Sequence, residues 1–399
     1  MNVLLVTDAY PPMRTSGAAQ MFDLGQAFIN EGIHVLVIYP RSNQASSLEI
    51  IRLSGCTVFS VRAFQTKDVA YWRRTLAELI NPFLMWFKLK NSPIFRAQKI
   101  HGIIWYSPTI FWGPLIKRLK QYFQCPSYLI QRDFFPDWAV DVGLMKKGLA
   151  YHFFKMVEKF QFQQADKIGV QSPNNQSYLN HQYPALSSKV EVLWNWLGNA
   201  ERVASSIDIK NTKLAGRTIL IYAGNMGVAQ GMEDLIQLIH ALRGRTDLGF
   251  VLVGRGSEVS RIRSFVNEQK VSNILIFDEI PSSQINSLFE QCHIGLLSLD
   301  MRHQAHNIPG KFIAYMHSGL PVFGFVNPGN DLQSMVYLRN IGTLLDHRDI
   351  TQATHHLDLL IHLTKQDSHI NLRCKNLAQE LFSASSATKQ ILKSFIDGH

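Results

Sequence analysis

The sequence predicts an α/β protein built from two doubly wound, Rossmann-like domains. Short apolar runs alternate with longer helical stretches along the whole chain, which is the pattern of parallel sheets whose strands are joined by helices. Most of these runs are apolar throughout instead of alternating with polar residues, as expected for strands that are covered on both faces. The chain also has 399 residues, which is too long for one ordinary domain.

The expected strands form two sets, separated by a polar stretch at residues 198–216 that we interpret as the linker. We therefore expect domains at residues 1–198 and 199–380, with a final helical segment, 381–399, that packs back on the first domain. Two such domains facing each other across a cleft would bind ligands beyond the carboxyl ends of their strands. The first set of expected strands is 2–8, 34–40, 58–64, 103–107, 128–132, 167–171 and 190–194, and the second is 218–223, 249–253, 274–278, 294–299, 321–326 and 342–345.

Composition excludes several classes of protein. Hydrophobic residues make up 46% of the chain and charged residues 18%, which favours buried cores over disorder. The four cysteines lack C-x-x-C spacing, so neither a disulfide framework nor a zinc cage is indicated. The first residues have no basic region or cleavage site and are expected to form a strand. The longest apolar stretch, 103–116, contains two prolines and is shorter than the ~20 residues of a membrane-spanning helix.

Two glycine-rich loops follow expected strands in the second domain. Residues 224–231 read Gly-Asn-Met-Gly-Val-Ala-Gln-Gly, and residues 254–258 read Gly-Arg-Gly-Ser-Glu. Glycines between a strand and a helix allow backbone N–H groups to approach a phosphate closely. Neither loop has the spacing of G-x-G-x-x-G or of a Walker loop, so each loop alone is a weak signal.

A lysine lies beside a third feature of the same domain. Residues 307–322 read Asn-Ile-Pro-Gly-Lys-Phe-Ile-Ala-Tyr-Met-His-Ser-Gly-Leu-Pro-Val and carry Lys311 into an amphipathic helical turn that ends at Gly319. A lysine next to the amino end of a helix indicates an anion site. The alternative is an ordinary junction between a loop, a helix and a strand.

Taken in order, these motifs resemble those of glycosyltransferase family 4, whose members have the GT-B fold and retain the anomeric configuration. Among family members, the motifs are most similar to those of bacterial O-antigen and capsule transferases, in particular the branch of L-fucosamine transferases. The segments that carry the resemblance are 8–12 (Asp-Ala-Tyr-Pro-Pro), 171–173 (Gln-Ser-Pro), 193–196 (Leu-Trp-Asn-Trp), 222–231, 253–258, 309–322 and 327–332 (Asn-Pro-Gly-Asn-Asp-Leu).

The resemblance implies a mechanism in which the second domain binds a UDP-sugar donor. Lys311 and Arg255 would neutralise the departing diphosphate, and that phosphate would accept the proton of the acceptor hydroxyl. Asp133 would orient the acceptor, although a helix cap is an equal alternative for this residue. Because no Asp-x-Asp motif is present, no metal is expected, and no cofactor besides the donor.

Some residues depart from the family pattern. Asn225 and Gln230 stand where the family often has an arginine and a lysine, and His306 and Ala314 stand where it has two glutamates. Arg132 replaces the histidine of the family's His-Asp turn and is grouped with the catalytic candidates. A surface histidine is the simpler interpretation of His306, and Asn330 and Asp331 could also cap the helix that follows them. The expected donor-binding residues are Gly17, Gly224, Asn225, Gly227, Gln230, Gly254, Glu258, Ile280, His306, Gly310, Asn330 and Asp331.

The charge distribution indicates an acidic partner for the first domain. The formal net charge is +10, and nearly all of the excess lies in residues 1–199, which favours a membrane surface, a phosphorylated acceptor or a nucleic acid. Segment 71–99 interleaves aromatic and basic residues, as interfacial helices on anionic leaflets do. The alternative is a packed helix whose aromatic residues belong to the core. The expected membrane contacts are Arg73, Arg74, Trp86, Lys88 and Lys90.

The sequence therefore predicts a retaining glycosyltransferase of O-antigen or capsule biosynthesis. It would move a sugar, with N-acetyl-L-fucosamine as the candidate, from UDP to a glycan linked to polyprenyl diphosphate. We expect it in the cytoplasm, peripheral on the inner face of the bacterial plasma membrane. One alternative is a nucleotide-sugar 2-epimerase of the same fold, although Ala314 removes a carboxylate that such an enzyme would need. A nucleic-acid binder is the other, but no helix-turn-helix, RRM or zinc pattern supports it, so no nucleic acid is expected.

Overall fold

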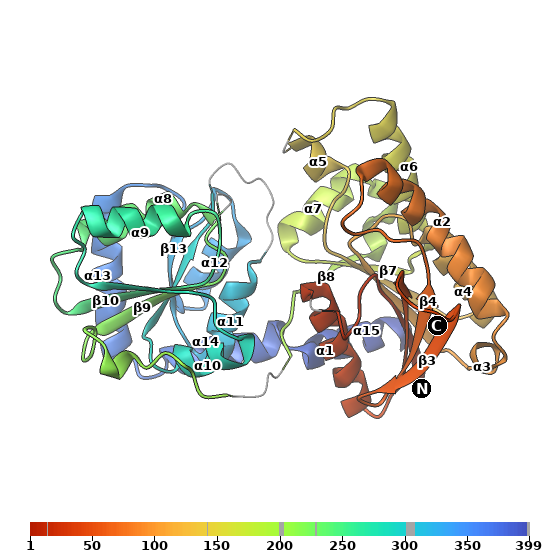
Figure 1. Ribbon diagram of the computed structural model, residues 1–399, viewed down its shortest axis with the longest axis horizontal. Helices are drawn as coiled ribbons and strands as arrows, with labels where there is room; N and C mark the ends of the chain where they lie inside the picture. Colours follow the sequence, from red (N-terminus) through yellow and green to blue (C-terminus); the bar gives the residue numbers. More distant parts are fainter. Residues whose placement is uncertain (14, 142, 199–202, 228–229, 301–307, 397–399) are drawn as a thin grey trace. The chain divides into compact units, whose positions relative to one another are not determined.

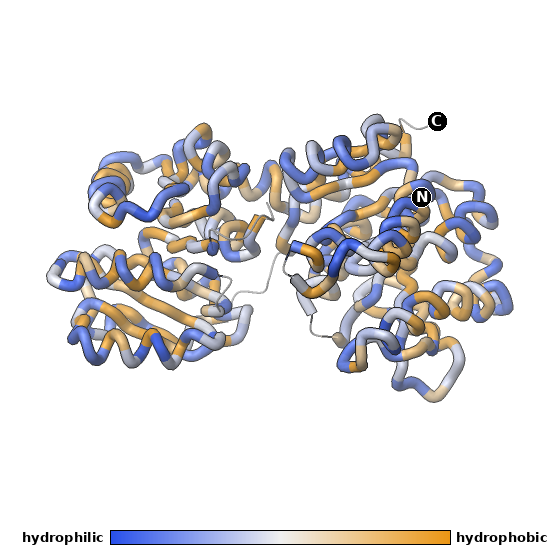
Figure 2. Tube along the Cα trace, turned by 90° about the horizontal axis from the view of Figure 1, so that it is seen from above, coloured by the Kyte–Doolittle hydropathy of each residue, from blue (hydrophilic) through white to orange (hydrophobic). Residues whose placement is uncertain are grey.

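The computed structural model describes residues 1–13, 15–141, 143–198, 203–227, 230–300 and 308–396. It divides the chain into two compact units, Met1–Gly198 with Ser383–His399, and Asn199–Phe382 (Figure 1). Each unit contains one β-sheet flanked by helices, which confirms the α/β class with two Rossmann-like domains. Figure 2 shows that the strands of both sheets are mostly hydrophobic, whereas hydrophilic residues follow the outer sides of the helices.

The first unit has an eight-stranded sheet in the order β3-β4-β2-β1-β5-β6-β7-β8. On either side of β1 the register pairs Leu4 with Leu36 and with Ile103. The chain winds outward in opposite directions from β1 and β5, so these two strands flank the switch point at which doubly wound sheets bind ligands. The strands are β1 (Asn2–Val6), β2 (His34–Arg41), β3 (Leu48–Leu53), β4 (Cys56–Arg62), β5 (Gly102–Ser107), β6 (Ser127–Gln131), β7 (Lys167–Val170) and β8 (Val190–Val192).

One strand of this sheet was not predicted. Strand β3 pairs antiparallel with β4, and the two are joined by a tight turn in which Ser54 and Gly55 have positive φ values of 48° and 86°. As the edge strand, β3 has no strand on its outer side and remains partly exposed. Its sequence therefore lacks the continuous apolar character by which the other strands were predicted.

Helices cover both faces of the first sheet (Figure 1). One core cluster combines α1, α15 and the sheet, and includes Phe28, Ile391 and Phe395. Gly102 on β5 provides the space for Phe395, because a Cβ atom there would lie 2.4 Å from its ring. The helices are α1 (Ser16–Asn30), α2 (Tyr71–Lys90), α3 (Pro93–Arg96), α4 (Gly113–Phe123), α5 (Asp137–Asp141), α6 (Leu149–Gln164), α7 (Pro173–Gln182) and α15 (Ala384–Ile396), with a 3₁₀ helix, η1, at Pro184–Lys189.

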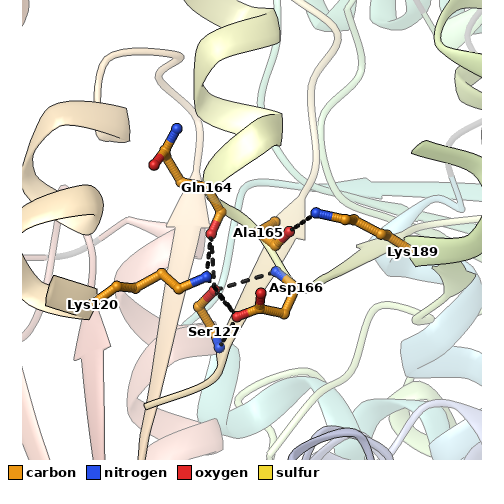
Figure 3. A network of polar contacts seen from close by, with 6 residues as sticks. All are labelled: Lys120, Ser127, Gln164, Ala165, Asp166 and Lys189. Atoms are coloured by element: carbon orange, nitrogen blue, oxygen red, sulfur yellow. Dashed lines mark hydrogen bonds and ion pairs between the residues drawn. The ribbon is translucent and has the colours of Figure 1, made fainter. Parts of the chain in front are cut away.

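A polar network holds the carboxyl ends of α4 and α6 against β6 (Figure 3). Asp166 Oδ2 accepts hydrogen bonds from Lys120 Nζ at 2.7 Å, from the Ser127 amide at 2.9 Å and from Ser127 Oγ at 2.8 Å. Lys120 also donates to the Gln164 carbonyl, and Lys189 Nζ donates to the Ala165 carbonyl. The two lysines thereby satisfy carbonyl groups at the end of α6, where positive charge is favourable.

The second unit has a six-stranded parallel sheet in the order β11-β10-β9-β12-β13-β14, with its switch point between β9 and β12. The strands are β9 (Thr218–Ala223), β10 (Leu248–Val253), β11 (Ile274–Phe277), β12 (Ile294–Ser298), β13 (Val322–Phe325) and β14 (Gly342–Leu345). The helices are α8 (Met232–Ala241), α9 (Val259–Glu268), α10 (Ser282–Phe289), α11 (Gly310–Ser318), α12 (Asp331–Leu338), α13 (Ile350–Gln366) and α14 (Ile370–Leu381), with a 3₁₀ helix, η2, at Ile209–Asn211. Within the described ranges, none of the helices of either unit combines the length and apolar character needed to cross a membrane.

Candidate functional site

The side chain of Lys311 projects from the first turn of α11 to the end of strand β9. Its Nζ atom donates hydrogen bonds to the Tyr222 hydroxyl at 2.5 Å and to Gln230 Oε1 at 2.8 Å. It also lies 3.9 Å from the centroid of the Tyr222 ring, a cation–π contact. No carboxylate pairs with Lys311 among the described residues, and burial lowers the pKa of its ammonium group to about 7. Within the described ranges, the site therefore holds a basic group that has no acidic partner.

Gly224 leaves open space beside this lysine. A Cβ atom at Gly224 would have only one neighbour within 4 Å, Lys311 Cε at 3.8 Å. The φ angle of Gly224 is 132°, a conformation that favours glycine. The Gly224 backbone and the Lys311 side chain thus lie side by side at the carboxyl end of β9, where doubly wound sheets bind ligands.

The second glycine loop packs directly on the first. The Gly224 amide donates to Val253 O at 2.9 Å, and the Met226 amide donates to Arg255 O at 2.7 Å. A Cβ atom at Gly254 would lie 1.9 Å from Gly224 O, and one at Gly256 would lie 2.4 Å from Met226 O. Gly254 and Gly256 are therefore required for backbone-to-backbone packing between the two loops. Gly227, by contrast, has only the flexible Asn225 side chain near its Cβ position, at 3.0 Å.

The side chains of Arg255 and Glu258, both predicted site residues of the second glycine loop, each pair with a neighbouring charged side chain. The Arg255 side chain is 79% exposed and forms a 3.3 Å ion pair with Glu279. Its charge is therefore not assembled with that of Lys311, although the backbone of its loop lies beside the Gly224 loop. Glu258 accepts a hydrogen bond from Arg261 at 2.6 Å, and Ile280, in the loop after β11, is partly buried.

The ends of two helices contribute the remaining predicted donor residues. Gly310 is the first residue of α11, and no side chain of another described residue lies within 4 Å of its Cβ position. Asn330 caps α12, since its side chain accepts a hydrogen bond from the Leu332 amide at 3.0 Å, and Asp331 is the first residue of that helix. His306 lies outside the described residues.

In the first unit, Arg132 is buried and does not line an open surface. Its side chain is 3% exposed, its Nη1 atom donates to Leu193 O at 3.1 Å, and its guanidinium group stacks on the Trp196 ring. Burial lowers the pKa of Arg132 to about 10. Its Nε and Nη2 atoms find no acceptor among the described residues. Asp133, the next residue, is exposed, and α5 begins only at Asp137, so Asp133 does not occupy the cap position of that helix.

Gly17 lies at the amino end of α1, close to strand β5. A Cβ atom at this position would lie 3.0 Å from Tyr106 Cε1, so glycine allows α1 to approach the Tyr106 ring. Burial raises the pKa of Tyr106 to about 12. Gly17 and Asp133 follow the carboxyl ends of β1 and β6, and Tyr106 is the penultimate residue of β5, so all three lie near the carboxyl edge of the first sheet.

Helix α2 exposes a stripe of large apolar side chains. The basic residues of α2 that were predicted to contact a membrane each interact with a neighbouring group of the protein. Arg73 lies over the Trp72 ring and Lys90 over the Phe87 ring, while Arg74 pairs with Glu78 at 2.8 Å. Trp86 packs against the core, and Lys88 donates to Arg62 O. The exposed apolar residues of α2 are Tyr71, Trp72, Leu76, Leu79, Ile80, Phe83 and Phe87.

Tyr222 is the functional residue that the sequence analysis did not single out. It lies in an apolar strand, and its hydroxyl donates to the Asn225 carbonyl at 2.7 Å. A tyrosine in such a strand is usually a core residue. Only the lysine, which lies 89 residues further along the chain, makes it part of the site. In the part of the chain that the structure describes, no three His, Cys, Asp or Glu side chains come together as metal ligands would.

Comparison with known proteins returned glycosyltransferases as sequence relatives. The chain is 22% identical over 221 residues to the glycosyltransferase WbjE of Pseudomonas aeruginosa, covering 54% of each chain. It is also 22% identical over 218 residues to the colanic acid biosynthesis glycosyl transferase WcaI of Escherichia coli, covering 52% of this chain and 53% of that relative. The chain thus spans about half the length of the relatives it matches. No protein-family model matches it.

Solved structures match nearly the full length of the chain. Sucrose-phosphate synthase from Thermosynechococcus elongatus aligns with a TM-score of 0.66 at 16% identity, covering 99% of this chain and 98% of that one. Anabaena HepE in complex with UDP aligns with a TM-score of 0.65 at 12% identity, covering all of both chains. WaaG, a glycosyltransferase involved in lipopolysaccharide biosynthesis, aligns with a TM-score of 0.62 at 13% identity, covering 98% of this chain and 99% of that one. The chain has the GT-B fold.

Proposed function

We propose that the protein is a glycosyltransferase of polysaccharide biosynthesis that uses a nucleotide-sugar donor. The observation that carries this proposal is the Lys311 side chain beside Gly224, which has no acidic partner in the part of the chain that the structure describes. A cation at the carboxyl end of a doubly wound sheet suits a diphosphate. The names of WbjE and WcaI support the same activity, and they do not favour the nucleotide-sugar 2-epimerase alternative.

In the proposed reaction the bond between the sugar anomeric carbon and the β-phosphate oxygen breaks. Negative charge then develops on the departing diphosphate, and Lys311 would stabilise this charge in a partly buried site. The acceptor hydroxyl oxygen forms the new bond to the anomeric carbon, and its proton passes to the phosphate. Tyr222 and Gln230 hold the ammonium group in place through the hydrogen bonds described above.

The direct test measures the release of nucleoside diphosphate from purified protein. A panel of UDP-sugars, including UDP-N-acetyl-L-fucosamine, is supplied with and without a synthetic polyprenyl-diphosphate-GlcNAc acceptor. We expect release that depends on the acceptor and falls by ~100-fold or more in Lys311→Ala, the loss seen when one preorganised charge-stabilising group is removed. Lys375→Ala is the matched control, because Lys375 lies at the opposite end of α11, near Gly319. Conversion of the donor sugar without release of UDP would instead establish an epimerase.

The finer parts of the proposal rest on the resemblance to family 4. We propose a retaining reaction with a UDP-sugar, for which N-acetyl-L-fucosamine is the first candidate, and a glycan linked to polyprenyl diphosphate as acceptor. The exposed position of Arg255 leaves Lys311 as the main positive group for the donor phosphates. The neutral residues Asn225 and Gln230 fit this arrangement, since Gln230 orients Lys311.

We also propose that the first unit contacts an anionic membrane surface from the cytoplasmic side. The apolar stripe of α2 supports this proposal, since Trp72 is 66% exposed and Phe87 is 58% exposed, each with a cation over its ring. Such aromatic residues flanked by basic ones suit the interface of an anionic bilayer.

A second helix of the first unit extends the same proposal. Helix α4 packs against both α2 and α6, and α6 exposes Leu149 and Met156. Arg118 of α4 lies over the ring of Phe83 on α2, 4.9 Å from the ring centroid. Helices α2, α4 and α6 would thus offer both apolar and basic side chains to the lipid surface.

A further inference from the structure

A pocket of about 100 Å³ opens at the carboxyl edge of the first sheet. It lies between one face of helix α2 and the carboxyl ends of β1, β2 and β5, where Asp8 follows β1, Pro40 is near the end of β2 and Thr109 follows β5. Ligands of doubly wound sheets bind at this edge. The sequence analysis assigned this pocket no role, and the Lys311 site belongs to the other unit.

Glu78 of α2 is held at the wall of this pocket. Its Oε1 atom accepts a hydrogen bond from Arg74 Nε at 2.8 Å, and its Oε2 atom accepts one from Thr109 Oγ1 at 2.8 Å. The Glu78 side chain is only 13% exposed. A carboxylate oxygen can accept more than one hydrogen bond, so both oxygens remain able to bind a ligand group.

A second charged pair lines the same pocket. Lys67 Nζ lies 3.4 Å from Asp8 Oδ2, and the two side chains are 46% and 22% exposed. The lining therefore carries two cations and two carboxylates, each cation beside a carboxylate. A free diphosphate would have to compete with these carboxylates, which makes the pocket a poor anion site.

The lining suits a neutral ligand with several hydroxyl groups. Each sugar hydroxyl can donate to a carboxylate and accept from an ammonium or guanidinium group. Pro40, Pro108, Phe111 and Trp112 form the apolar walls, and apolar walls combined with polar groups that fix orientation are typical of small-molecule sites. We propose that this pocket binds one sugar residue of the acceptor. This inference rests on the proposed function.

Helix α2 connects the pocket with the apolar stripe. Arg74, Glu78 and Asn81 line the pocket at spacings of four and three residues, which places them on one face of the helix. Trp72 and Phe83 are exposed to solvent on the same helix. At about 3.6 residues per turn, Trp72 and Phe83 lie on the face of α2 opposite the pocket-lining residues, so one face of the helix lines the pocket while the other is exposed.

The test is saturation-transfer NMR on the full chain, without any donor present. The probes are the methyl glycosides of glucose, galactose, N-acetylglucosamine and N-acetyl-L-fucosamine, and inorganic pyrophosphate is the competing anion. We expect at least one glycoside to bind with a Kd of ~1–10 mM, that is, ~3–4 kcal/mol. Glu78→Gln should weaken this binding by ~10-fold, the effect of ~1.4 kcal/mol. Glu49→Gln is the control, because Glu49 of β3 lies outside the pocket lining and forms a partly exposed 3.7 Å pair with Arg41 of β2.

Lys67→Ala keeps the test decisive if Glu78→Gln fails to fold, because the half-exposed Lys67 side chain is not needed for the core. The proposal is overturned if no glycoside binds, if binding is unchanged in both pocket variants, or if pyrophosphate binds more tightly and displaces the glycoside. Glycoside binding should persist in Lys311→Ala. A protein that binds the glycoside but never transfers a sugar would refute the proposed function and leave this inference standing.

Discussion

The ammonium group of Lys311 lies 3.9 Å from the centroid of the Tyr222 ring and donates a hydrogen bond to its hydroxyl. An aromatic face stabilises a cation without neutralising its charge. A carboxylate in the same place would compete with any phosphate for the lysine. Tyr222 therefore holds the lysine in position while leaving it available for an anionic ligand.

Binding of UDP should be coupled to the uptake of a proton by Lys311. Burial lowers the pKa of the free lysine to about 7, whereas a phosphate beside it favours the charged form and raises this pKa. Between pH 7.5 and 9 we therefore expect the affinity for UDP to fall as the pH rises, by up to ~10-fold per pH unit. Calorimetry in two buffers with different ionisation enthalpies measures the number of protons that are taken up when UDP binds.

The matched variant for this experiment is Lys311→Met, which should bind UDP more weakly and without proton uptake. Lys375→Met should behave as the unchanged protein. An affinity that stays constant over this pH range would mean that Lys311 is already charged before UDP binds.

Gly254→Ala should destabilise the second unit strongly. A Cβ atom at this position would lie 1.9 Å from Gly224 O, and the φ of 151° is rarely adopted by residues with a side chain. We expect a loss of ~3 kcal/mol or more in the free energy of unfolding, because the two loops would have to separate. Urea unfolding monitored by fluorescence measures this change in the free energy of unfolding.

Gly310→Ala serves as the control, since among the described residues no other side chain lies within 4 Å of its Cβ position. It should change the free energy of unfolding by less than ~1 kcal/mol. Equal effects of the two substitutions would contradict the packing of the two loops described here.

Asp166→Asn should lower stability at neutral pH and lose this effect in acid. Burial raises the pKa of Asp166, but hydrogen bonds from Lys120 and Ser127 outweigh burial, so its net pKa is lowered. A lowered carboxyl pKa stabilises the fold above the unfolded value of ~3.9, and this contribution disappears as the pH falls through the folded pKa. Because the side chain is 48% exposed, we expect ~0.5–1 kcal/mol at pH 7 after solvent screening.

Thermal unfolding of this variant at pH 7 and pH 3 checks the prediction. Asp278→Asn is the control, because Asp278 is 89% exposed in its pair with Arg263 and should change little at either pH. A difference between Asp166→Asn and the unchanged protein that is as large at pH 3 as at pH 7 would show that charge is not the cause.

Replacing apolar residues of α2 should weaken binding to liposomes. We expect Trp72→Ser with Phe87→Ser to reduce sedimentation with vesicles that contain phosphatidylglycerol, because both side chains are largely exposed and aromatic residues anchor interfacial helices. Neutralising Arg73 and Lys90 should reduce binding by ~1 kcal/mol for each charge. Tyr337→Ser, an exposed aromatic residue of the second unit, is the control, and equal binding by all variants would refute a membrane role for α2.

The local sequence determined much of the fold. Runs such as 218–223 and 342–345 correspond to β9 and β14 with the same bounds, because a strand covered on both faces requires continuous apolar residues. Strand β3 is the exception, since all of its side chains are partly or fully exposed, so its composition was not constrained in the same way. The sequence also predicts an anion site at Lys311 and the glycine loops, because such a site needs particular residue types in a particular order.

Only the tertiary structure decided what each of these residues touches. Tyr222 meets Lys311 because parallel pairing brings the end of β9 to the start of α11, and Glu78 meets Thr109 across 31 residues. The burial of Arg132 and the exposure of the α2 aromatic residues likewise depend on neighbours from elsewhere in the chain. Composition sets which residues can form strands, helices and charged sites, whereas burial and electrostatic partners arise from contacts between distant segments.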